Sequence, residues 1–586
     1  MNDDKAIARI DRQIMWNRLI TVVEEQAQTL VRTAFSTTVR EAGDLSVGVF
    51  DVQGRMLAQA VTGTPGHVNS MMEATRCMMQ AYPAAGMREG DAYITNDPWV
   101  SCGHLHDFTV LTPVFRHGAL VAMMVSTAHV VDIGGRGLGP EGRQVFEEGL
   151  AVPIMHFARA GEVNQDLLQI VRANVREPLQ VEGDLMSLLT SNEDGARRLV
   201  AMMDEFGIAN LQPLAEHILQ TSREATMKRL AALPNSRWNA VRVRDGYDFP
   251  VRLEATLEIS DNGVHVDYSG SSGPSKYGIN VVLNYTTAYT VYTLKCLLAP
   301  DTPNNAGSLA PFTVSAPDGC ILNVRRPWPV AARHIVGHMV PDMVMACLGD
   351  LLPERVLAEG SGTIWNPLLR GGNSVLEDDM PIDAATLPPD FTLYHFNSGG
   401  MGARARKDGL STTAFPSGVT TQSIEVAEMV APVIFWRKEL RPSSGGAGRQ
   451  RGGLGQVIEI GGAHGYPISN FSMFDRVEHA AQGRSGGDAG ATGTVRLKSG
   501  AAVKAKGKVV IPSGDRLVLE LPGGAGFGPA CEREPQRVAD DVRHGYVSST
   551  QALDLYRVAL QVDGAVDQHA TDALRRSALA GQQSQS

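Results

Sequence analysis

Long hydrophobic runs are missing from this sequence. No stretch of about 18 apolar residues, the minimum for a membrane-spanning helix, occurs in it. The six cysteines are scattered and form no CxxC pair, which argues against a disulfide framework or a structural zinc knuckle. The opening residues MNDDKAIARIDRQ are polar and of mixed charge, unlike a secretory signal. We therefore expect a cytoplasmic protein without a membrane anchor.

An excess of basic charge is also missing. The formal net charge is -10, and a protein that binds a phosphate backbone needs a basic face, so nucleic acid is not expected as the main partner. The phosphate-binding pattern GxxxxGK[ST] is absent, and SGGAGRQRGG lacks the strand and helix that flank a dinucleotide-binding loop. Neither of these two nucleotide-binding loops is therefore expected in this chain.

The length of 586 residues exceeds what one hydrophobic core serves, so several packed units are expected. Residues 10–35 carry apolar residues at helical spacing, whereas LSVGVFDVQGRMLAQAV alternates as a β-hairpin does, with Gly54 in the turn. Glycine is dense in residues 440–530, where short apolar runs predict β-strands joined by tight turns.

These patterns predict an α+β fold with several domains, in which mixed antiparallel sheets pack with helices. We expect four segments, which are an N-terminal α+β domain that carries the candidate site (1–232), a central α+β domain (233–435), a β-rich glycine-dense domain (436–530) and a C-terminal helical segment with a tail (531–586).

Three potential metal ligands precede an apolar strand in SCGHLHDFTVLTPVF, which spans residues 101–115. A turn is expected near residues 117–118, after which ALVAMMVSTAHV returns antiparallel. In that hairpin Asp107 lies opposite Ala128 or His129. His104 stands three residues upstream of Asp107, in the loop that leads into the strand. The hairpin therefore predicts one cluster of His104, Asp107 and His129.

Two imidazoles and one carboxylate can occupy one face of Mn²⁺, Fe²⁺ or Zn²⁺ and leave positions open for water or substrate. Such a site suits catalysis, because it can polarise a carbonyl or activate water near neutral pH. Asp132, in VVDIGG, is a candidate to orient a ligating imidazole. His106 is a further candidate, which should point away from Asp107 if the strand has begun. The simpler alternative is a hydrogen-bonded polar group at a strand end, with Cys102 as a bystander.

Several segments together carry a family signature and occur in the family's order over nearly the whole chain. They are LSVGVFDVQGRMLAQA, PGHVNSM, NDPWVSCGHLHDFTVLTPVF, STAHVVDIGG, NAGSLAPFTVSAPDGCILN, RPSSGGAGRQRGGLG and LPGGAGFGPACEREPQRVADDVRHGYVS. In these segments the chain resembles the hydantoinase B/oxoprolinase family. That family includes ATP-dependent hydantoinases and N-methylhydantoinases, oxoprolinases, lactamases for larger rings such as caprolactam, and the related acetone and acetophenone carboxylases.

The resemblance implies a division of labour between two kinds of subunit. A partner of the hydantoinase A type, with an actin- or hexokinase-like ATPase fold, would bind ATP and Mg²⁺. Two copies of each chain are the expected assembly, a heterotetramer. In the carboxylases of the family, the subunit similar to this chain holds a divalent metal through His, Asp and His at the spacing of His104, Asp107 and His129. One Zn²⁺ or Mn²⁺ ion is therefore expected here.

The resemblance also adds catalytic candidates and shows two departures. Asp44 and His67 lie in other family-like segments, and they join Asp132 and His106 as catalytic candidates. Many members have Pro where this chain has His106, and a second His where it has Val130. Neither departure affects the three metal-ligand candidates.

We therefore expect the metal-bearing subunit of an ATP-dependent hydrolase that acts on the C–N bond of a cyclic amide, such as a lactam, a hydantoin or oxoproline. An unstrained amide is a poor electrophile, and phosphorylation of its oxygen on the partner would improve it. The metal here would then activate water, or hold the tetrahedral oxyanion, to open the ring. The first alternative is a subunit of an ATP-dependent ketone carboxylase of the acetone or acetophenone type. The second alternative is a non-catalytic scaffold for the ATPase subunit.

Overall fold

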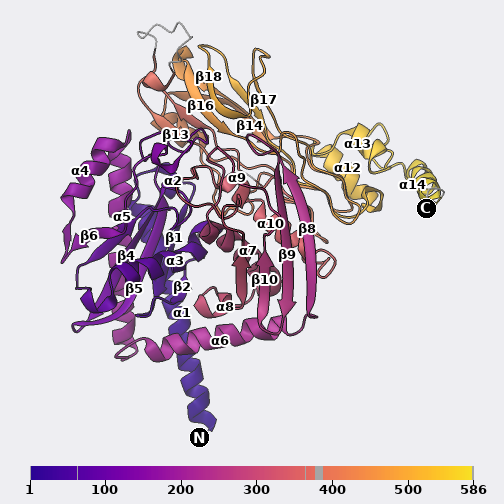
Figure 1. The fold of residues 1–586 in the computed structure, drawn as a ribbon. Coiled ribbons are helices and arrows are strands. Elements are labelled where there is room, and N and C mark those ends of the chain that lie inside the picture. Colours follow the sequence, from indigo (N-terminus) through magenta and orange to yellow (C-terminus); the bar gives the residue numbers. More distant parts are fainter. Residues whose placement is uncertain (1, 62–63, 363, 376–386, 584–586) are drawn as a thin grey trace. The chain divides into compact units, whose positions relative to one another are not determined.

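The computed structural model describes residues 2–61, 64–362, 364–375 and 387–583 (Figure 1). Its mixed α/β architecture with several antiparallel sheets confirms the predicted fold class. None of the described helices is long and apolar enough to cross a membrane.

The chain divides into two compact units. Unit 1 comprises residues 1–242, 252–347 and 417–422, and unit 2 comprises residues 243–251, 348–416 and 423–586. The division into four segments stays a prediction.

Unit 1 contains a seven-stranded sheet whose neighbouring strands are all antiparallel. Its order is β2 (Met56–Gln59), β1 (Leu45–Phe50), β5 (Ala119–His129), β4 (Asp107–Arg116), β3 (Ala92–Thr95), β6 (Met155–Arg159) and β7 (Glu162–Val163). The predicted first hairpin is confirmed as β1 and β2, with Gly54 at a φ of 77° in the connection.

The hairpin of β4 and β5 carries two of the three predicted metal ligands. His117 and Gly118 form its two-residue turn with φ values of 50° and 74°, the left-handed conformation that a tight hairpin turn needs. Asp107 pairs with His129, which confirms one of the two predicted registers. Because side chains alternate between the faces of a strand and these two residues are directly opposite each other, both side chains lie on the same face of the sheet.

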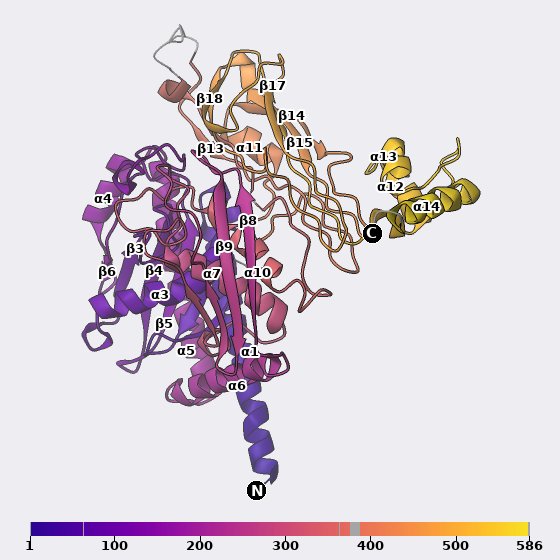
Figure 2. The ribbon, with the colours of Figure 1, turned by 45° about the vertical axis from the view of Figure 1, so that its right-hand side comes forward.

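Helices cover both faces of this sheet. The helices of this part of the chain are α1 (Asn2–Thr33), α2 (Thr37–Arg40), α3 (Pro65–Ala81), α4 (Gln165–Asn174), α5 (Pro178–Glu205) and α6 (Gln212–Leu230). Val49 and Met124 share a core with α1, α5 and α6. Gly48, the residue before Val49, instead approaches Met71 of α3, so α3 lies on the opposite face. The first turns of α1 extend away from the rest of unit 1 (Figures 1 and 2).

A four-stranded sheet and a second group of helices follow in the chain. The strand order is β11 (Phe312–Ser315), β10 (Gly263–Asp267), β9 (Val251–Ser260) and β8 (Ser236–Arg244). The helices are α7 (Leu283–Leu298), α8 (Ala306–Leu309), α9 (His334–Gly337) and α10 (Val340–Cys347). Helix α7 packs on α3, α10 and β11. This packing brings the α7–α10 region to the α3 side of the seven-stranded sheet.

Unit 2 contains two antiparallel four-stranded sheets that share one hydrophobic core. One sheet has the order β13 (Thr392–Tyr394), β12 (Leu368–Arg370), β16 (Ile468–Met473) and β18 (Lys506–Ile511). The other has the order β14 (Val433–Leu440), β15 (Gln456–Gly462), β19 (Leu517–Glu520) and β17 (Thr494–Leu497). Trp365 is buried between them and stacks on Phe474 with the ring centres 4.7 Å apart. The helices of unit 2 are α11 (Ile424–Val430), α12 (Pro535–Arg543), α13 (Ser549–Asp554) and α14 (Gln568–Gln583).

Glycine-rich segments of unit 2 hydrogen-bond to one another outside the two sheets. We call residues 399–403, 444–455 and 522–528 the glycine bundle. The Gly453 N–H donates to the Met401 carbonyl at 2.9 Å. Further along the bundle, Gly524 N–H donates to the Gly453 carbonyl, also at 2.9 Å.

These glycines allow backbones to approach closely. A β-carbon on Gly524 would lie 2.0 Å from the Met401 oxygen, and one on Gly453 would lie 2.0 Å from the Leu410 oxygen. Neither glycine has a positive φ. The tight-turn explanation is therefore wrong for these positions, because what they need is the absence of a side chain between packed backbones.

We expect Gly524→Ala to destabilise the protein by about 3 kcal/mol, because its β-carbon meets rigid backbone rather than a movable side chain. Gly273→Ala is the matched control, since its β-carbon would meet nothing within 4 Å and Gly273 has no positive φ. Urea unfolding of the two variants measures the difference. Equal unfolding free energies would contradict the close-packing explanation.

Candidate metal centre

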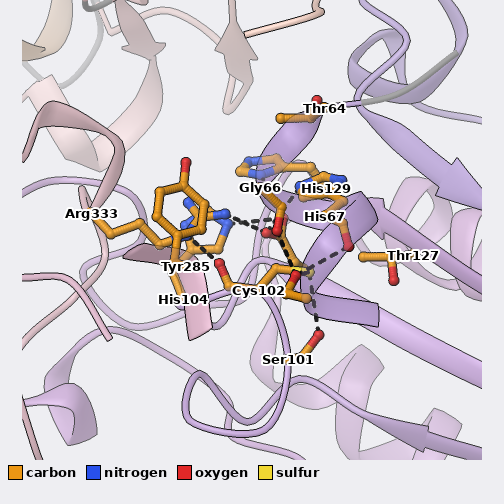
Figure 3. A network of polar contacts seen from close by, with 12 residues as sticks. Thr64, Gly66, His67, Ser101, Cys102, His104, Thr127, His129, Tyr285 and Arg333 are labelled. Atoms are coloured by element: carbon orange, nitrogen blue, oxygen red, sulfur yellow. Dashed lines mark hydrogen bonds and ion pairs between the residues drawn. The ribbon is translucent and has the colours of Figure 1, made fainter. Parts of the chain in front are cut away.

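The carboxylate of Asp107, the first residue of β4, is fully buried and has four nitrogen-bearing neighbours. Its Oδ1 lies 2.8 Å from His104 Nε2 and 3.0 Å from His129 Nδ1. Its Oδ2 lies 3.1 Å from His67 Nε2 and 2.5 Å from Arg333 Nη2. His104 and Arg333 lie on one side of the site, and His67 and His129 on the other (Figure 3). The structure therefore brings the three predicted ligands together and adds two residues to them.

Strand alternation and the start of α3 position this cluster. The β4–β5 register places Asp107 opposite His129, and the hydroxyls of Thr109 and Thr127 hydrogen-bond across the same pair of strands at 2.9 Å. His67 lies in the first turn of α3, on the face of the sheet that this helix covers.

Asp44 precedes β1 and reaches the same site. Its Oδ1 accepts a hydrogen bond from Thr64 at 2.7 Å and lies 3.5 Å from His67 Nε2. Its Oδ2 lies 3.8 Å from His129 Nδ1. The structure thus brings both Asp44 and His67 to the predicted cluster.

His104 shows that the donor set fits a cation. A carbonyl can only accept, so the contact of 3.0 Å between His104 Nδ1 and the Ala331 oxygen places the ring proton on Nδ1. Nε2 then turns its lone pair toward the Asp107 carboxylate, and no hydrogen bond forms there despite the short distance. Burial and the Arg333 guanidinium lower the pKa of His104 to about 4, so the ring is neutral at pH 7. A cation between these two lone pairs would satisfy both.

The charges around Asp107 decide its ionisation. Burial opposes the charged form, but His104, His67 and Arg333 outweigh burial and hold the pKa of Asp107 well below its usual range. Because His104 is neutral above about pH 4, the permanent positive charge beside Asp107 at pH 7 is that of the Arg333 guanidinium. The pKa of His67 is raised: burial lowers it, and the carboxylates of Asp107 and Asp44 more than offset that effect.

A second donor set, His67, Cys102 and Asp107, also has its atoms within 4.8 Å of one another. It would use Oδ2 of Asp107, where the Arg333 guanidinium already lies and would repel a cation. Burial and the Asp107 charge raise the pKa of Cys102 to about 12, which keeps the thiol protonated. The set of His104, Asp107 and His129 on the Oδ1 side is therefore the better metal site.

His106 and Asp132 occupy different surroundings. The His106 ring stacks on His129 with centres 5.1 Å apart and lies 5.3 Å from the His104 ring. Strand β4 begins only at Asp107, so strand alternation does not direct His106 away from the cluster. Asp132 accepts hydrogen bonds from the Arg176 side chain and the Gly134 N–H, at 3.0 and 3.3 Å. These two contacts hold the loop after β5, and a catalytic role for either His106 or Asp132 stays a prediction.

Arg333 and Tyr285 are the site residues that sequence reasoning missed. The Arg333 guanidinium also donates to the Cys102 carbonyl and lies 4.2 Å from the centre of the Tyr285 ring. A β-carbon on Gly66 or Gly337 would come within 2.4 Å of that ring, so the two glycines enclose it. One available signal is the run VAARHIV, because a lone arginine among apolar residues needs a buried counter-ion.

One known protein family matches most of this chain. The family described as hydantoinase B/oxoprolinase matches residues 8–530. The chain belongs to this family. A relative named as a putative D-/L-hydantoinase subunit of the B type, from Pseudomonas sp. strain NS671, is 27% identical over 98% of this chain and 99% of its own length. 5-Oxoprolinase 1 of Arabidopsis thaliana is 27% identical over 89% of this chain, which spans only 42% of that protein.

Two solved structures have the same fold as this hydantoinase B/oxoprolinase chain. The ATP-dependent caprolactamase from Pseudomonas jessenii has a TM-score of 0.87 at 24% identity, over 97% of this chain and 99% of that one. A nucleotide-free acetone carboxylase has a TM-score of 0.83 at 21% identity, over 98% of this chain and 84% of that one. At these identities the likeness establishes the fold.

We expect Arg333→Met to cost the metal-free protein about 3–5 kcal/mol of unfolding free energy, because Asp107 would stay buried without its guanidinium partner. Urea unfolding in the presence of a chelator is the measurement. Arg326→Met is the matched control: its side chain is 42% exposed, and its ion pair with Asp97 should contribute about 1 kcal/mol or less. A similar loss in both variants would contradict the role given to Arg333.

Proposed function

We propose that this chain is the metal-bearing subunit of an ATP-dependent hydrolase that opens cyclic amides. The observation that carries the proposal is the position of His104. Its Nδ1 is committed to the Ala331 carbonyl, and its buried Nε2 faces the ionised Asp107 at 2.8 Å without a hydrogen bond. A divalent cation would bind both the Nε2 lone pair of His104 and the carboxylate of Asp107.

Three side chains of this chain would hold the ion. They are His104 through Nε2, Asp107 through Oδ1 and His129 through Nδ1, a set that suits Zn²⁺ and Mn²⁺ alike. A divalent ion bound there would supply Lewis acidity, which polarises a carbonyl or lowers the pKa of water. Arg333 binds Oδ2 of Asp107, so the carboxylate presents Oδ1 to the site in one orientation.

His67 is the residue best suited to move a proton during ring opening. When the C–N bond of a cyclic amide breaks, the leaving nitrogen must gain a proton. His67 has a raised pKa, and its buried Nδ1 has no hydrogen-bond partner, whereas its Nε2 is held beside Asp107 and Asp44. We assign it the general-acid role. Asp44 would keep the His67 ring oriented, and Asp132 and His106 stay candidates for a supporting role.

ATP would be used by a partner of the hydantoinase A type. An amide is a weak electrophile, and phosphorylation of its oxygen on the partner would prepare it for attack by water. Two observations on the relatives support the presence of a partner. The Pseudomonas relative is named as one subunit of a hydantoinase, and this chain matches only 42% of the length of the Arabidopsis 5-oxoprolinase, which leaves room for another part. A heterotetramer with two copies of each chain is the proposed assembly.

A ketone carboxylase subunit is the second candidate, favoured by the fold shared with acetone carboxylase. It would use the same metal site and the same kind of partner. Two likenesses support the hydrolase as the first choice. One relative is named as a hydantoinase subunit, and this chain matches 99% of the length of the caprolactamase structure. The non-catalytic scaffold is the weakest candidate, because a scaffold has no need of the buried His104, Asp107 and His129 cluster.

We expect the wild-type chain, co-purified with its partner and loaded with Zn²⁺ or Mn²⁺, to retain about one ion per copy after dialysis. His104→Ala, Asp107→Asn and His129→Ala should each bind the ion at least about 10-fold more weakly. Elemental analysis measures the content. His117→Asn is the control, because His117 is exposed in the same hairpin and asparagine tolerates its positive φ. Wild-type metal content in His129→Ala would refute the ligand assignment.

We expect ATP turnover of the complex to rise with a cyclic amide from a panel of hydantoin, 5-oxoproline and caprolactam. His104→Ala should lower that turnover by about 100-fold or more, because it removes a ligand rather than a supporting contact. Acetone or acetophenone with bicarbonate is the opposing arm, and ATP use that depends on it would replace the hydrolase with the carboxylase. Turnover that is unchanged by His104→Ala would favour the scaffold.

A further inference from the structure

Glu148 is a buried carboxyl group outside the proposed donor set. It follows the short helical turn 145–147 and is 1% exposed. Its Oε1 accepts hydrogen bonds from the backbone N–H groups of Val330 and Ala331, at 2.6 and 2.8 Å. Its Oε2 has no hydrogen-bond partner, and no ion pair to Glu148 is found among the described residues. Both N–H groups therefore bind the same oxygen of Glu148, and these are the hydrogen bonds through which its carboxyl group is held.

The two N–H groups belong to the turn that serves the metal centre. We call residues 330–333 the support turn, which closes on itself through a hydrogen bond of 3.0 Å from the Arg333 N–H to the Val330 carbonyl. The Ala331 carbonyl accepts from His104 Nδ1. At the end of the turn, the Arg333 side chain binds Asp107. One short turn therefore orients one proposed ligand and neutralises another.

We infer that Glu148 is a positioning residue for the metal centre: by holding the N–H groups of Val330 and Ala331, it fixes the support turn that orients His104 and Asp107. The inference rests on the proposed function, because it takes His104 and Asp107 to be ligands. Glu148 itself touches neither the donor atoms nor Arg333 in any contact found among the described residues.

Neighbouring contacts show why this position requires an acceptor. Gly278 lies beside it, and a β-carbon there would come within 3.2 Å of Glu148 Oε1 and 3.4 Å of the Ala331 nitrogen. A replacement that cannot accept would leave two buried N–H groups without partners, and the turn would shift to satisfy them. Contacts that orient a ligand in this way typically change metal affinity by about 10- to 100-fold.

The ionisation of Glu148 suggests the conservative replacement. Burial raises the pKa of Glu148 to about 8, with a smaller contribution from the charge of Glu147, and the two N–H groups only partly oppose it. The acid is therefore mostly protonated at pH 7. Glutamine is also neutral and keeps an oxygen in the position of Oε1, so it can accept both hydrogen bonds.

The experiment compares Mn²⁺ affinity and the visible absorption spectrum of the Co²⁺-loaded protein, both in the complex with its partner. Glu148→Leu should weaken Mn²⁺ binding by about 10- to 100-fold and shift the Co²⁺ bands, because His104 loses its orientation. Glu148→Gln should stay within about threefold of wild type and keep the bands. Glu147→Leu is the control, since Glu147 is partly exposed and its carboxylate binds Arg136.

Glu148→Asp covers the case in which the leucine variant does not fold. It retains the acid, but its shorter side chain should not reach both N–H groups, so Mn²⁺ binding should weaken while the protein stays folded. Wild-type Mn²⁺ affinity and wild-type Co²⁺ bands in a folded Glu148→Leu, or in Glu148→Asp, would overturn the inference and leave the proposed function intact. Failure of the wild-type complex to bind Mn²⁺, Zn²⁺ or Co²⁺ would overturn the proposed metal centre and the inference together.

Discussion

Burial of the Asp107 carboxylate is the constraint on which the candidate site depends. A charge with no exposure to solvent must be compensated by the protein, and Asp107 is compensated on both oxygens. On Oδ2, the Arg333 guanidinium supplies positive charge, and His67 Nε2 lies 3.1 Å away. On Oδ1, His104 and His129 supply nitrogen atoms, and His104 is neutral at pH 7. The two oxygens therefore have different roles: one is a partner in a buried ion pair, and the other faces a set of metal donors.

This asymmetry explains how the site can combine stability with a function. His104, His67 and Arg333 together hold the pKa of Asp107 well below its usual range, so the carboxylate is already ionised in the metal-free protein and no Asp107 proton has to leave when an ion binds. The neutral ring of His104 likewise has its lone pair ready on Nε2. The proposed proton carrier is His67, whose pKa is raised because the carboxylates of Asp107 and Asp44 outweigh the effect of burial. The proposed ligand set and the proposed proton carrier thus share one carboxylate: the ligands His104 and His129 lie at Oδ1, and His67 lies at Oδ2.

Unit 2 solves a different physical problem. Its glycine bundle replaces side-chain packing with close contact between backbones, which needs many positions without a β-carbon. Sequence reasoning recognised the density of glycine and the short strands around it, but assigned the glycines to turns. Nothing local distinguishes the two uses. A turn glycine is required by its own φ, whereas Gly524 is required by the carbonyl of Met401, which lies far away in the sequence.

Sequence alone determined the part of the site that local periodicity controls. The two-residue turn at His117 and Gly118 leaves Asp107 opposite Ala128 or His129, and His104 follows from its short distance along the chain. The turn alone would pair Asp107 with Ala128, and a β-bulge between Val114 and Phe115 shifts the pairing to His129. Only the tertiary structure decided the rest. Arg333 and Tyr285 reach the cluster, and Glu148 reaches the support turn, through the packing of distant segments such as α7 on α3, over separations that no periodicity spans. The folded structure also places His106 among the imidazole rings and gives each oxygen of Asp107 its own neighbours. The physical reason is that a hairpin fixes pairs of residues through its own hydrogen bonds, whereas the charge balance of a buried carboxylate depends on whichever distant segments the folded core places against it.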